Sequence, residues 1–340
     1  MSESGAKPRL ARRIRYRLER GLLSAAVWLL PKLPRRPVQW CSAAVGTLAW
    51  MADGRGRRTG MANLLAALGP AVPIAERRRI LRSSYRVFAA TFFDLFWSPR
   101  VRAEDWDRWF VLECETDAAR EALRKNNCLY ITGHLGGFEL LNVAKALAAG
   151  TAMTIAQNFK NPSLTAIFAR LRSVGGRQEM IAQEGAMLRL FRHLKKGGSA
   201  GALVDLKVDV LRNGHPMRTF GMLTSASALH CVLAQRTGVP IVPLMALPSP
   251  DGRMIMHLCD PIHVAPDEPI IPAMQRTWDV FEAFIRKHPE LWLWMYKHWR
   301  YVPEGVDAAT YPSYAIRLPE FDMMLQAADG SSSAEESAAA

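Results

Sequence analysis

Short apolar runs of strand length alternate with longer amphipathic stretches through the middle of the chain. The apolar runs lie at residues 126–133, 151–157, 199–205, 239–247 and 253–261. Helical patterns separate them at 136–149, 161–174, 184–197 and 225–238. This alternation predicts an α/β fold, with a mostly parallel central sheet flanked by helices. The active site of such a fold is expected at the carboxyl ends of the strands.

The N-terminal region combines basic and apolar helical patterns. Residues 9–23 place leucine or isoleucine every fourth position among six arginines, which predicts a basic amphipathic helix suited to an anionic membrane surface. The apolar stretches 22–30 and 38–52 are both shorter than the about 20 residues that a spanning helix needs. We therefore expect residues 1–53 to form an interfacial or re-entrant membrane anchor. The alternatives are a single span or a solvated helix docked on its own domain.

The remaining chain divides by composition into a large domain and a tail. Residues 54–100 show helical patterns, and together with the alternating region they predict one domain over 54–325. Residues 326–340 are small and polar and predict a disordered tail.

Charge and cysteine usage exclude some classes of protein. Of the formal charge of +13, residues 1–60 supply most, with 13 Lys and Arg against three acids. This segregation argues against a nucleic-acid-binding protein, although DNA affinity that survived removal of residues 1–60 would revive that class. The five cysteines are scattered without a CxxC motif, which predicts a reducing compartment, no disulfide framework and no zinc cluster.

The run CLYITGHLGGFELLN at 128–142 passes from a strand pattern through glycines into a helix pattern. His134 follows the strand, Gly136 and Gly137 permit a tight turn, and Glu139 falls in the first helical turn. We expect Glu139 to reach one ring nitrogen of His134, so that the other nitrogen can act as a general base. No neighbouring serine, threonine or cysteine is an obvious nucleophile, so the attacking group would belong to the substrate. The alternative is an acid favoured by the helix dipole beside a non-catalytic histidine.

Other motifs are less specific. His263 and Glu268 share the same spacing but lie in a proline-containing loop pattern. The sequence GGSAG at 197–201 matches a nucleophile elbow, but its helix precedes the serine and its strand follows, which is the reverse order. Arg170 and Arg172 close a helical pattern. Either side chain could stabilise an oxyanion or hold a phosphate, although arginine is favoured at helix ends in any protein.

Together these segments resemble the late acyltransferases of lipid A biosynthesis, of the lauroyl/myristoyl type, within the H-x4-D/E acyltransferases. The segments that carry the resemblance are RGRRTGMANLLAALG, GHLGGFE, NPSLTAIFARLRSVGG, LVDLKVD, FGMLTSASALHCVLAQRTGVPIVPLMAL and PELWLWMYKHWRYVPEG. They follow one another in the family's order between residues 10 and 306. The resemblance implies a glycerolipid-acyltransferase-like fold and makes residues 54–325 the acyltransferase domain.

The resemblance also implies roles for site residues. His134 would deprotonate an acceptor hydroxyl, Glu139 would orient the ring, and Arg172, in preference to Arg170, would stabilise the oxyanion formed at an acyl thioester. The substrate-binding residues implied are Arg170, Asn161, Asp205, Gly136 and Gly137. No metal and no cofactor is implied.

The implied reaction joins two lipid substrates at a membrane. The donor would be an acyl carrier protein thioester, or acyl-CoA, and the acceptor a hydroxyl of a lipid A precursor. The protein would sit on the cytoplasmic face of a bacterial inner membrane through its N-terminal segment, without a nucleic acid partner. Three departures leave the acceptor open: Phe138 before the acid, Leu206 after Asp205, and Tyr296-Lys297-His298 at the family's His-Arg-Arg position. Alternatives are a lysophospholipid, ornithine lipid or glycolipid acceptor, or a catalytically silent lipid-binding membrane protein.

Overall fold

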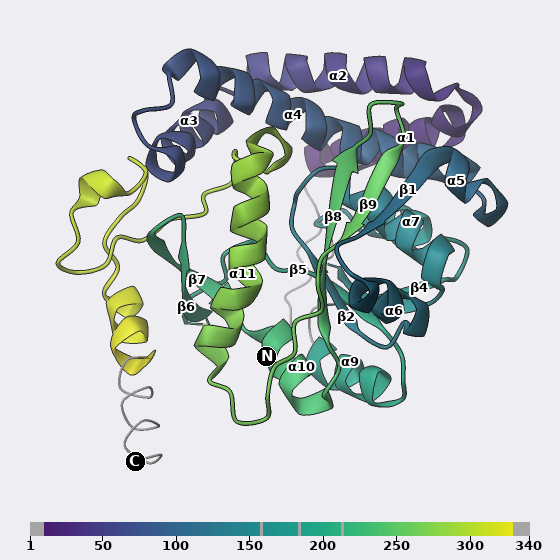
Figure 1. Cartoon of the computed structure of the whole chain (residues 1–340). Helices are drawn as coiled ribbons and strands as arrows, with labels where there is room; N and C mark the ends of the chain where they lie inside the picture. The colour runs from purple at the N-terminus through teal and green to yellow at the C-terminus, as the bar shows by residue number, and fades with distance from the viewer. Residues whose placement is uncertain (1–9, 157–158, 183–184, 212–213, 329–340) are drawn as a thin grey trace.

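The computed structural model describes residues 10–156, 159–182, 185–211 and 214–328, and contains a seven-stranded central sheet (Figure 1). The strand order is β1-β9-β8-β2-β5-β3-β4, in which β8 and β9 pair antiparallel and every other pair is parallel. The predicted mostly parallel sheet is thereby confirmed. The strands are β1 (Phe110–Cys114), β2 (Leu129–Thr132), β3 (Ala152–Ala156), β4 (Gln178–Ala182), β5 (Ala200–Leu203), β8 (Ile241–Pro248) and β9 (Met254–Leu258).

Helices cover both faces of the sheet. The first four are α1 (Leu10–Leu29), α2 (Arg35–Ala52), α3 (Gly54–Leu68) and α4 (Ile74–Trp97). The others are α5 (Trp106–Trp109), α6 (Asp117–Lys125), α7 (Phe138–Ala149), α8 (Pro162–Arg172), α9 (Ala186–Lys195), α10 (Leu229–Thr237) and α11 (Ile270–Lys287). A further helix covers 319–328.

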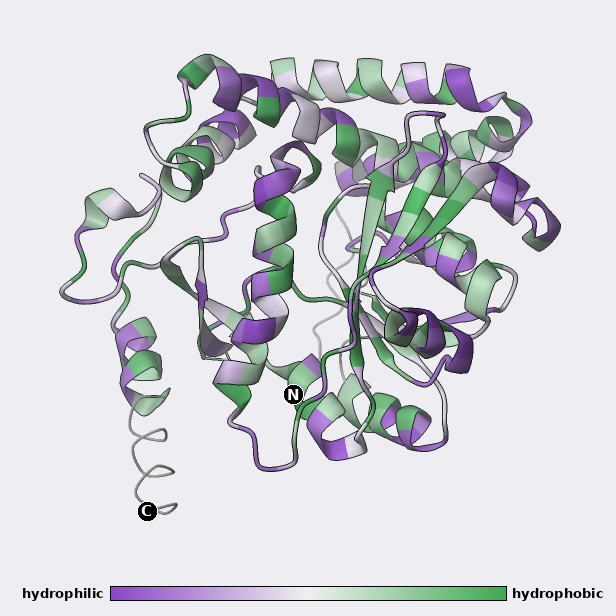
Figure 2. Ribbon diagram, in the orientation of Figure 1, coloured by the Kyte–Doolittle hydropathy of each residue, from purple (hydrophilic) through white to green (hydrophobic). Residues whose placement is uncertain are grey.

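The strands are apolar because both faces of the sheet are buried. Leu129 and Ile131 of β2 pack with α9, α10 and α11 on one face, whereas Tyr130 packs with α7 on the other. Figure 2 shows β8, β9 and β1 predominantly in the hydrophobic colour. Continuous burial on two faces produces the unbroken apolar runs seen in the sequence.

Two parts of the fold differ from the sequence prediction. The polar segment 204–221, for which the sequence predicts no strand, contains β6 (Gly214–Thr219), which pairs antiparallel with β7 (Met222–Ser227). The helix expected at 225–238 therefore begins at Leu229, as α10. Phe220 and Gly221 connect the two strands with φ of 49° and 80°. Two consecutive positive φ values suit a tight hairpin turn, but the dipeptide Phe-Gly does not signal one as Asn-Gly does.

The N-terminal helices pack against the body of the protein. Arg35 of α2 forms a two-pronged ion pair with Asp94 of α4, with Nη2 donating to Oδ2 over 3.0 Å, and both side chains are largely buried. Asp53 caps α3 by accepting a hydrogen bond from the Gly56 amide over 2.8 Å. None of the helices in the described ranges combines the length and apolarity required to cross a membrane.

Candidate active site

The turn between β2 and α7 depends on one glycine in particular. Gly136 has φ of 56°, and a Cβ at this position would lie 2.1 Å from the backbone oxygen of Ala246. Its amide donates to Leu291 O over 2.9 Å, and its carbonyl accepts a hydrogen bond from Thr91 over 2.9 Å. These contacts fix the turn so that the residue just before it, His134, sits at the carboxyl end of the central strand.

The ring of His134 is held by Asp205, which directly follows the neighbouring strand β5. His134 Nδ1 lies 2.9 Å from Asp205 Oδ1, and the His134 backbone N–H donates to Oδ2 over 2.8 Å. The indole N–H of Trp292 also donates to Oδ2, over 3.0 Å. Asp205 therefore accepts three hydrogen bonds, and its side chain is only 1% exposed. Acceptance by Oδ1 places the proton of a neutral His134 on Nδ1 and leaves Nε2 as the basic atom.

Burial and charge act in opposite directions on this pair. Burial of the His134 ring lowers its pKa, but the attraction of the Asp205 carboxylate and their hydrogen bond outweigh burial, so the pKa is raised above its ordinary value. Burial likewise raises the pKa of Asp205, but His134 more than compensates, and the carboxyl pKa is lowered. The site thus holds an ionised carboxylate beside an imidazole of increased basicity.

The expected contact between Glu139 and the His134 ring is not formed. Both oxygens of Glu139 face the guanidinium of Arg172, whose Nε donates over 3.1 and 3.0 Å while Nη2 makes a further short hydrogen bond to Oε1. Glu139 is 4% exposed and Arg172 is 19% exposed. Glu139 lies in the first turn of α7, so its side chain points toward the end of α8 rather than back across the turn. Its charge still contributes to the raised pKa of His134.

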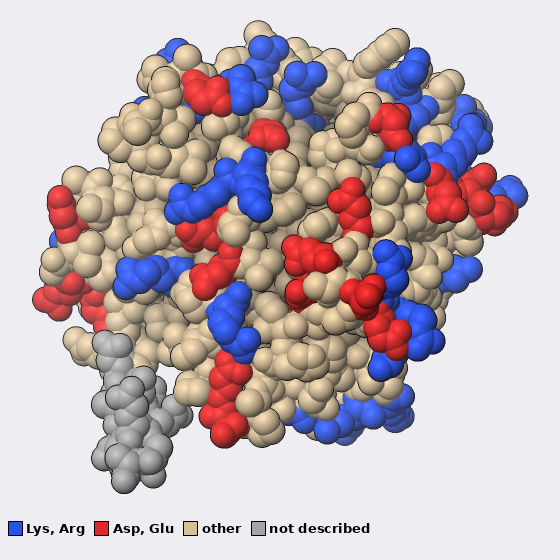
Figure 3. Space-filling model, in the orientation of Figure 1, with Lys and Arg blue, Asp and Glu red and all other residues tan. Residues whose placement is uncertain are grey.

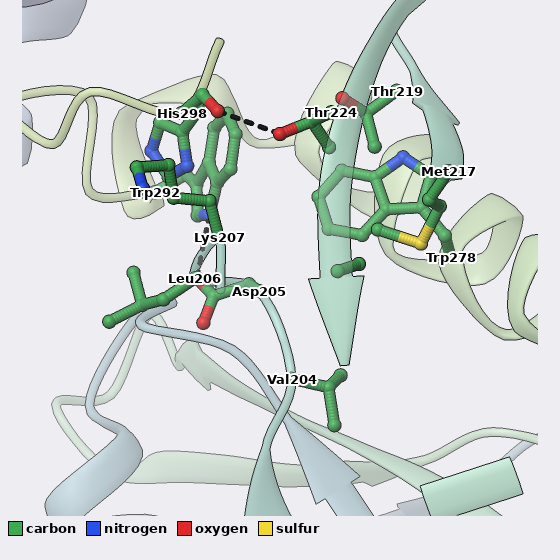
Figure 4. Close-up of a pocket in the computed structure, with 11 residues that line it drawn as sticks. Val204, Asp205, Leu206, Lys207, Met217, Thr219, Thr224, Trp278, Trp292 and His298 are labelled. Atoms are coloured by element: carbon green, nitrogen blue, oxygen red, sulfur yellow. Dashed lines mark hydrogen bonds between the residues drawn. The ribbon is translucent and has the colours of Figure 1, made fainter. Parts of the chain in front are cut away.

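A segment without regular secondary structure supports Asp205 from behind. Trp292 stacks on His298 with ring centroids 4.0 Å apart, and the backbone oxygen of His298 accepts a hydrogen bond from Thr224 (Figure 4). Burial lowers the pKa of His298 to about 4, so this ring is neutral at physiological pH. Asn63 of α3 donates to the Trp294 and Tyr296 oxygens over 2.8 and 2.7 Å. The cavity beside Asp205 measures only about 10 Å³, so it has no room for a substrate.

The other predicted site residues occupy three different environments. Asn161 caps α8, and its amide donates to Glu19 of α1 over 3.0 Å. The 11 residues of α8 separate Asn161 from Arg172 by about 16 Å, so the structure does not bring Asn161 to the histidine. Asp205, expected to bind substrate, is buried against His134 instead. Gly137 is the N-cap residue of α7 and has room for a Cβ, 3.6 Å from a methionine sulfur.

Arg170 lies at a larger cavity on the outer side of α7 and α8. This cavity measures about 650 Å³ and is lined mainly by apolar side chains from α1, α7, α8 and the segment after α4. Two of the lining residues lie near the site: Val143 is one helical turn after Glu139 on α7, and Leu171 directly precedes Arg172 on α8. Its volume falls within the range of small-molecule sites, which are commonly apolar with a few polar groups. The remaining lining residues are Ser24, Val27, Trp28, Ser98, Pro99, Val101, Leu147, Ile167, Val174 and Gly175.

Sequence reasoning missed Trp292 and the partnership of Asp205 with His134. A signal for the partnership existed, because adjacent parallel strands bring the residues after them to one sheet edge. Using it required the knowledge that β5 neighbours β2, and strand order is not visible in a single sequence. Trp292 carried no signal, because a tryptophan in an apolar segment is ordinarily part of a core.

Comparison with known proteins gives one positive result. None of the curated proteins matches the chain. Residues 9–301, however, match the family described as bacterial lipid A biosynthesis acyltransferase. The match spans His134, Glu139, Arg172, Asp205 and Trp292, so it includes every group of the site described above. The chain therefore belongs to the bacterial lipid A biosynthesis acyltransferase family.

Proposed function

We propose that this protein transfers a fatty acyl group from a carrier thioester to a hydroxyl of a lipid A precursor, with His134 as general base. Family membership supports acyl transfer onto lipid A. The observation that carries the proposed chemistry is the arrangement of His134. Asp205 occupies its Nδ1, and within the described ranges Nε2 has no hydrogen-bond partner. A base without a protein nucleophile suits direct attack by an acceptor hydroxyl.

The proposed step exchanges a thioester for an oxygen ester. His134 Nε2 takes the proton of the acceptor hydroxyl as the oxygen attacks the thioester carbonyl carbon. The tetrahedral intermediate then collapses, the carbon–sulfur bond breaks, and the imidazolium returns its proton to the leaving thiolate. The products are an ester and a free carrier thiol. Asp205 stabilises the imidazolium between these two proton transfers, and general-base assistance of this kind contributes about 10² to 10⁴ in rate.

Arg172 is the proposed group for the oxyanion. Glu139 engages its Nε and Nη2, and among the described residues Nη1 has no hydrogen-bond partner. Glu139 thereby holds the guanidinium in one orientation and leaves an N–H pair for the developing negative charge. Removal of one such donor typically costs about 10² to 10³ in kcat. In this proposal Glu139 is a positioning residue for Arg172, whereas Asp205 positions the base.

We assign the acyl chain to the cavity of about 650 Å³ beside α7 and α8. Its apolar lining suits a hydrocarbon chain, and Leu171 and Val143 connect it to the ends of the helices that carry Arg172 and Glu139. Arg170 at this cavity offers a cation to an anionic group of the donor. We propose acyl carrier protein as the donor and acyl-CoA as a substitute that presents the same thioester.

The N-terminal helices present a surface suited to the cytoplasmic face of the inner membrane. On α1, Ile14, Leu18 and Leu22 are 50%, 62% and 74% exposed, and on α2, Trp40 is 71% exposed. Apolar side chains of this size rarely remain in water together on a soluble surface, and arginines surround those of α1. Attraction of these arginines to anionic lipids would add about 1 kcal/mol each near the surface.

The decisive experiment uses purified full-length protein with an acyl carrier protein thioester and a lipid A precursor. We expect the precursor to gain the mass of one acyl chain, and we expect His134→Ala to abolish the gain. In cells that lack the protein, total-lipid mass spectrometry should show lipid A without one acyl chain, restored by the wild type alone. If a different lipid lost an acyl chain instead, that lipid would be the acceptor in place of the lipid A precursor. Full rescue by His134→Ala would overturn the assignment of His134 as the base.

Membrane docking is tested by flotation with vesicles of phosphatidylglycerol and phosphatidylethanolamine. We expect the wild type to float and a triple serine variant at Ile14, Leu18 and Leu22 to remain in the soluble fraction. Thr47, whose hydroxyl hydrogen-bonds its own helix, provides a matched control as Thr47→Ala. Equal flotation of the triple variant and the control would refute docking through α1.

A further inference from the structure

A cluster of metal-ligating side chains lies away from the proposed active site, where the edge strand β1 and its neighbour β9 end. Glu115, His257 and Cys259 each present one ligand atom, and these atoms lie within 4.8 Å of one another. We propose that this β1–β9 cluster is a zinc-binding site, with water as the fourth ligand and Glu113 as the partner of the histidine. The proposal is independent of the acyl-transfer mechanism, because no residue of the cluster contacts the groups around His134.

Strand register explains how the four side chains meet. In the parallel pair of β1 and β9, Glu113 is directly opposite His257. Glu115 and Cys259 follow two residues later on their chains, so all four side chains project from the same face of the sheet. Helix α11 covers the same face of the sheet closer to the sheet's centre, because Cys259 packs in the same core as Trp278 of α11. Figure 3 shows acidic side chains gathered near β1 and β9 on the face in view.

One separation within the cluster matches that of two ligands on a tetrahedral zinc ion. His257 Nε2 lies 3.2 Å from Glu115 Oε1. Two ligand atoms bound tetrahedrally at 2.0–2.1 Å lie about 3.3 Å apart, so this pair is already separated as a zinc ion requires. The combination of thiolate, imidazole and carboxylate is a set that Zn²⁺ accepts, whereas Mg²⁺ and Ca²⁺ prefer oxygen alone. Three protein ligands and a water are the usual content of an open zinc site.

The second nitrogen of His257 provides an observation beyond the ligand set. Nδ1 is buried and makes no hydrogen bond, yet it lies 3.5 Å from Glu113 Oε2. A metal-bound histidine almost always donates its other N–H to a carboxylate or carbonyl. With zinc on Nε2, the proton moves to Nδ1 and Glu113 becomes that acceptor. The cation therefore satisfies an atom that is otherwise unpaired.

The charges of the cluster also favour a cation. In the described part of the chain, Glu113 and Glu115 lie within ion-pairing distance of His257 but of no lysine or arginine. Zinc would displace the thiol proton to solvent and bind the resulting thiolate. The sequence pattern did not predict this site, because its ligands are single residues about 140 positions apart in two strands.

The test measures metal bound to the full-length protein, in a Cys41→Ser background that removes the exposed cysteine. After equilibrium dialysis against buffered Zn²⁺, elemental analysis should give one zinc per chain. Co²⁺ in its place should give a near-ultraviolet thiolate-to-cobalt absorption band. We expect Cys259→Ser to remove the band and lower zinc affinity by at least about tenfold. Cys114→Ser, on the neighbouring strand β1 but on the opposite face of the sheet, should leave both unchanged.

Two further variants keep the proposal testable if Cys259→Ser fails to fold. Glu115 is exposed, so Glu115→Gln should fold and lose zinc. Glu113→Gln should retain one zinc per chain with about 10- to 100-fold weaker binding, because only the histidine's partner is removed. Substoichiometric zinc, a cobalt complex without a thiolate band, or equal affinity in Glu115→Gln and the wild type would overturn the site.

Discussion

Asp205→Asn is the most informative single change, because the structure specifies how it would alter the base. Asp205 Oδ2 accepts two N–H groups, from the His134 backbone and from the Trp292 indole, whereas Oδ1 accepts one from the ring. An asparagine has one acceptor oxygen and one NH₂ group. Its oxygen belongs where it satisfies two donors, so its NH₂ group faces the ring. His134 Nδ1 must then be the unprotonated nitrogen, and the proton moves to Nε2.

This exchange of tautomer removes the base without removing the side chain. Nε2 would carry a proton and could not take one from the acceptor. In a serine protease the equivalent change of a triad aspartate lowers kcat by about 10⁴ through the wrong tautomer. We expect a loss of about 10² to 10⁴ in kcat here, equivalent to about 3 to 5.5 kcal/mol in the activation free energy. The remaining activity should still decrease toward acid pH, but this decrease should occur at a lower pH than in the wild type. The reason is that loss of the Asp205 charge lowers the pKa of His134.

The assay is initial-rate acylation of a lipid A precursor between pH 5 and 9, with near-ultraviolet circular dichroism as the control for folding. Glu139→Gln is the matched comparison, since it changes a carboxylate of the same site that does not contact the ring. We expect Glu139→Gln to reduce the rate while retaining the wild-type tautomer. A folded Asp205→Asn protein within about threefold of the wild-type rate at every pH would refute the reasoning.

Three other changes have defined outcomes. Trp292→Phe keeps an aromatic ring but removes one hydrogen bond to Asp205, so kcat should fall about tenfold in a protein that remains folded with a lowered melting temperature. Gly136→Ala meets a backbone oxygen at 2.1 Å and a positive φ, so urea denaturation should show a loss of more than about 2 kcal/mol, whereas Gly137→Ala should stay within about 1 kcal/mol. Lys145 is buried, and burial lowers its pKa to about 8. Between pH 8 and 10.5 the unfolded chain therefore binds the Lys145 proton more tightly than the folded chain, and this lysine should add a rising contribution of up to about 3 kcal/mol to the pH dependence of wild-type stability. Lys145→Met should remove this rise, and equal slopes in the two proteins would contradict the assignment.

The fold was predictable where a single hydrophobic pattern dominated a stretch of the sequence. The runs that became β2, β8 and β9 lie mostly inside the fold, so hydrophobicity alone marked them, whereas the run of β5 is apolar although Leu203 is exposed. Strand β4, with the sequence QEMIA, lies at the sheet edge and begins with two polar residues, of which Gln178 is buried and Glu179 exposed, so its sequence did not show an apolar strand pattern. The β6–β7 hairpin was missed because threonine, serine and proline give its strands a polar appearance, although Met217, Met222 and Ala226 are buried.

The candidate site was predictable in its parts but not in its pairings. The position of His134 followed from a strand, a turn and a helix that are all local in sequence. The pairing of Glu139 with Arg172, and of His134 with Asp205, depends on how α8 and β5 lie beside the turn. Two carboxylates were available to one imidazole, and spacing favoured the nearer in sequence. The sheet brought the more distant one instead, because β5 hydrogen-bonds directly to β2.

The dependence of Asp205 on Trp292 has a consequence for the order in which the protein becomes active. A ribosome makes the chain from its N-terminus, so helices α1 to α4 emerge first and His134 soon afterwards. The indole that holds the carboxylate, and the Trp294 and Tyr296 carbonyls that bind Asn63, are synthesised more than 150 residues later. A growing chain that lacks Trp292 therefore lacks one of the three hydrogen bonds to Asp205. Under the proposed mechanism, the base would be fully oriented only once this late segment is in place.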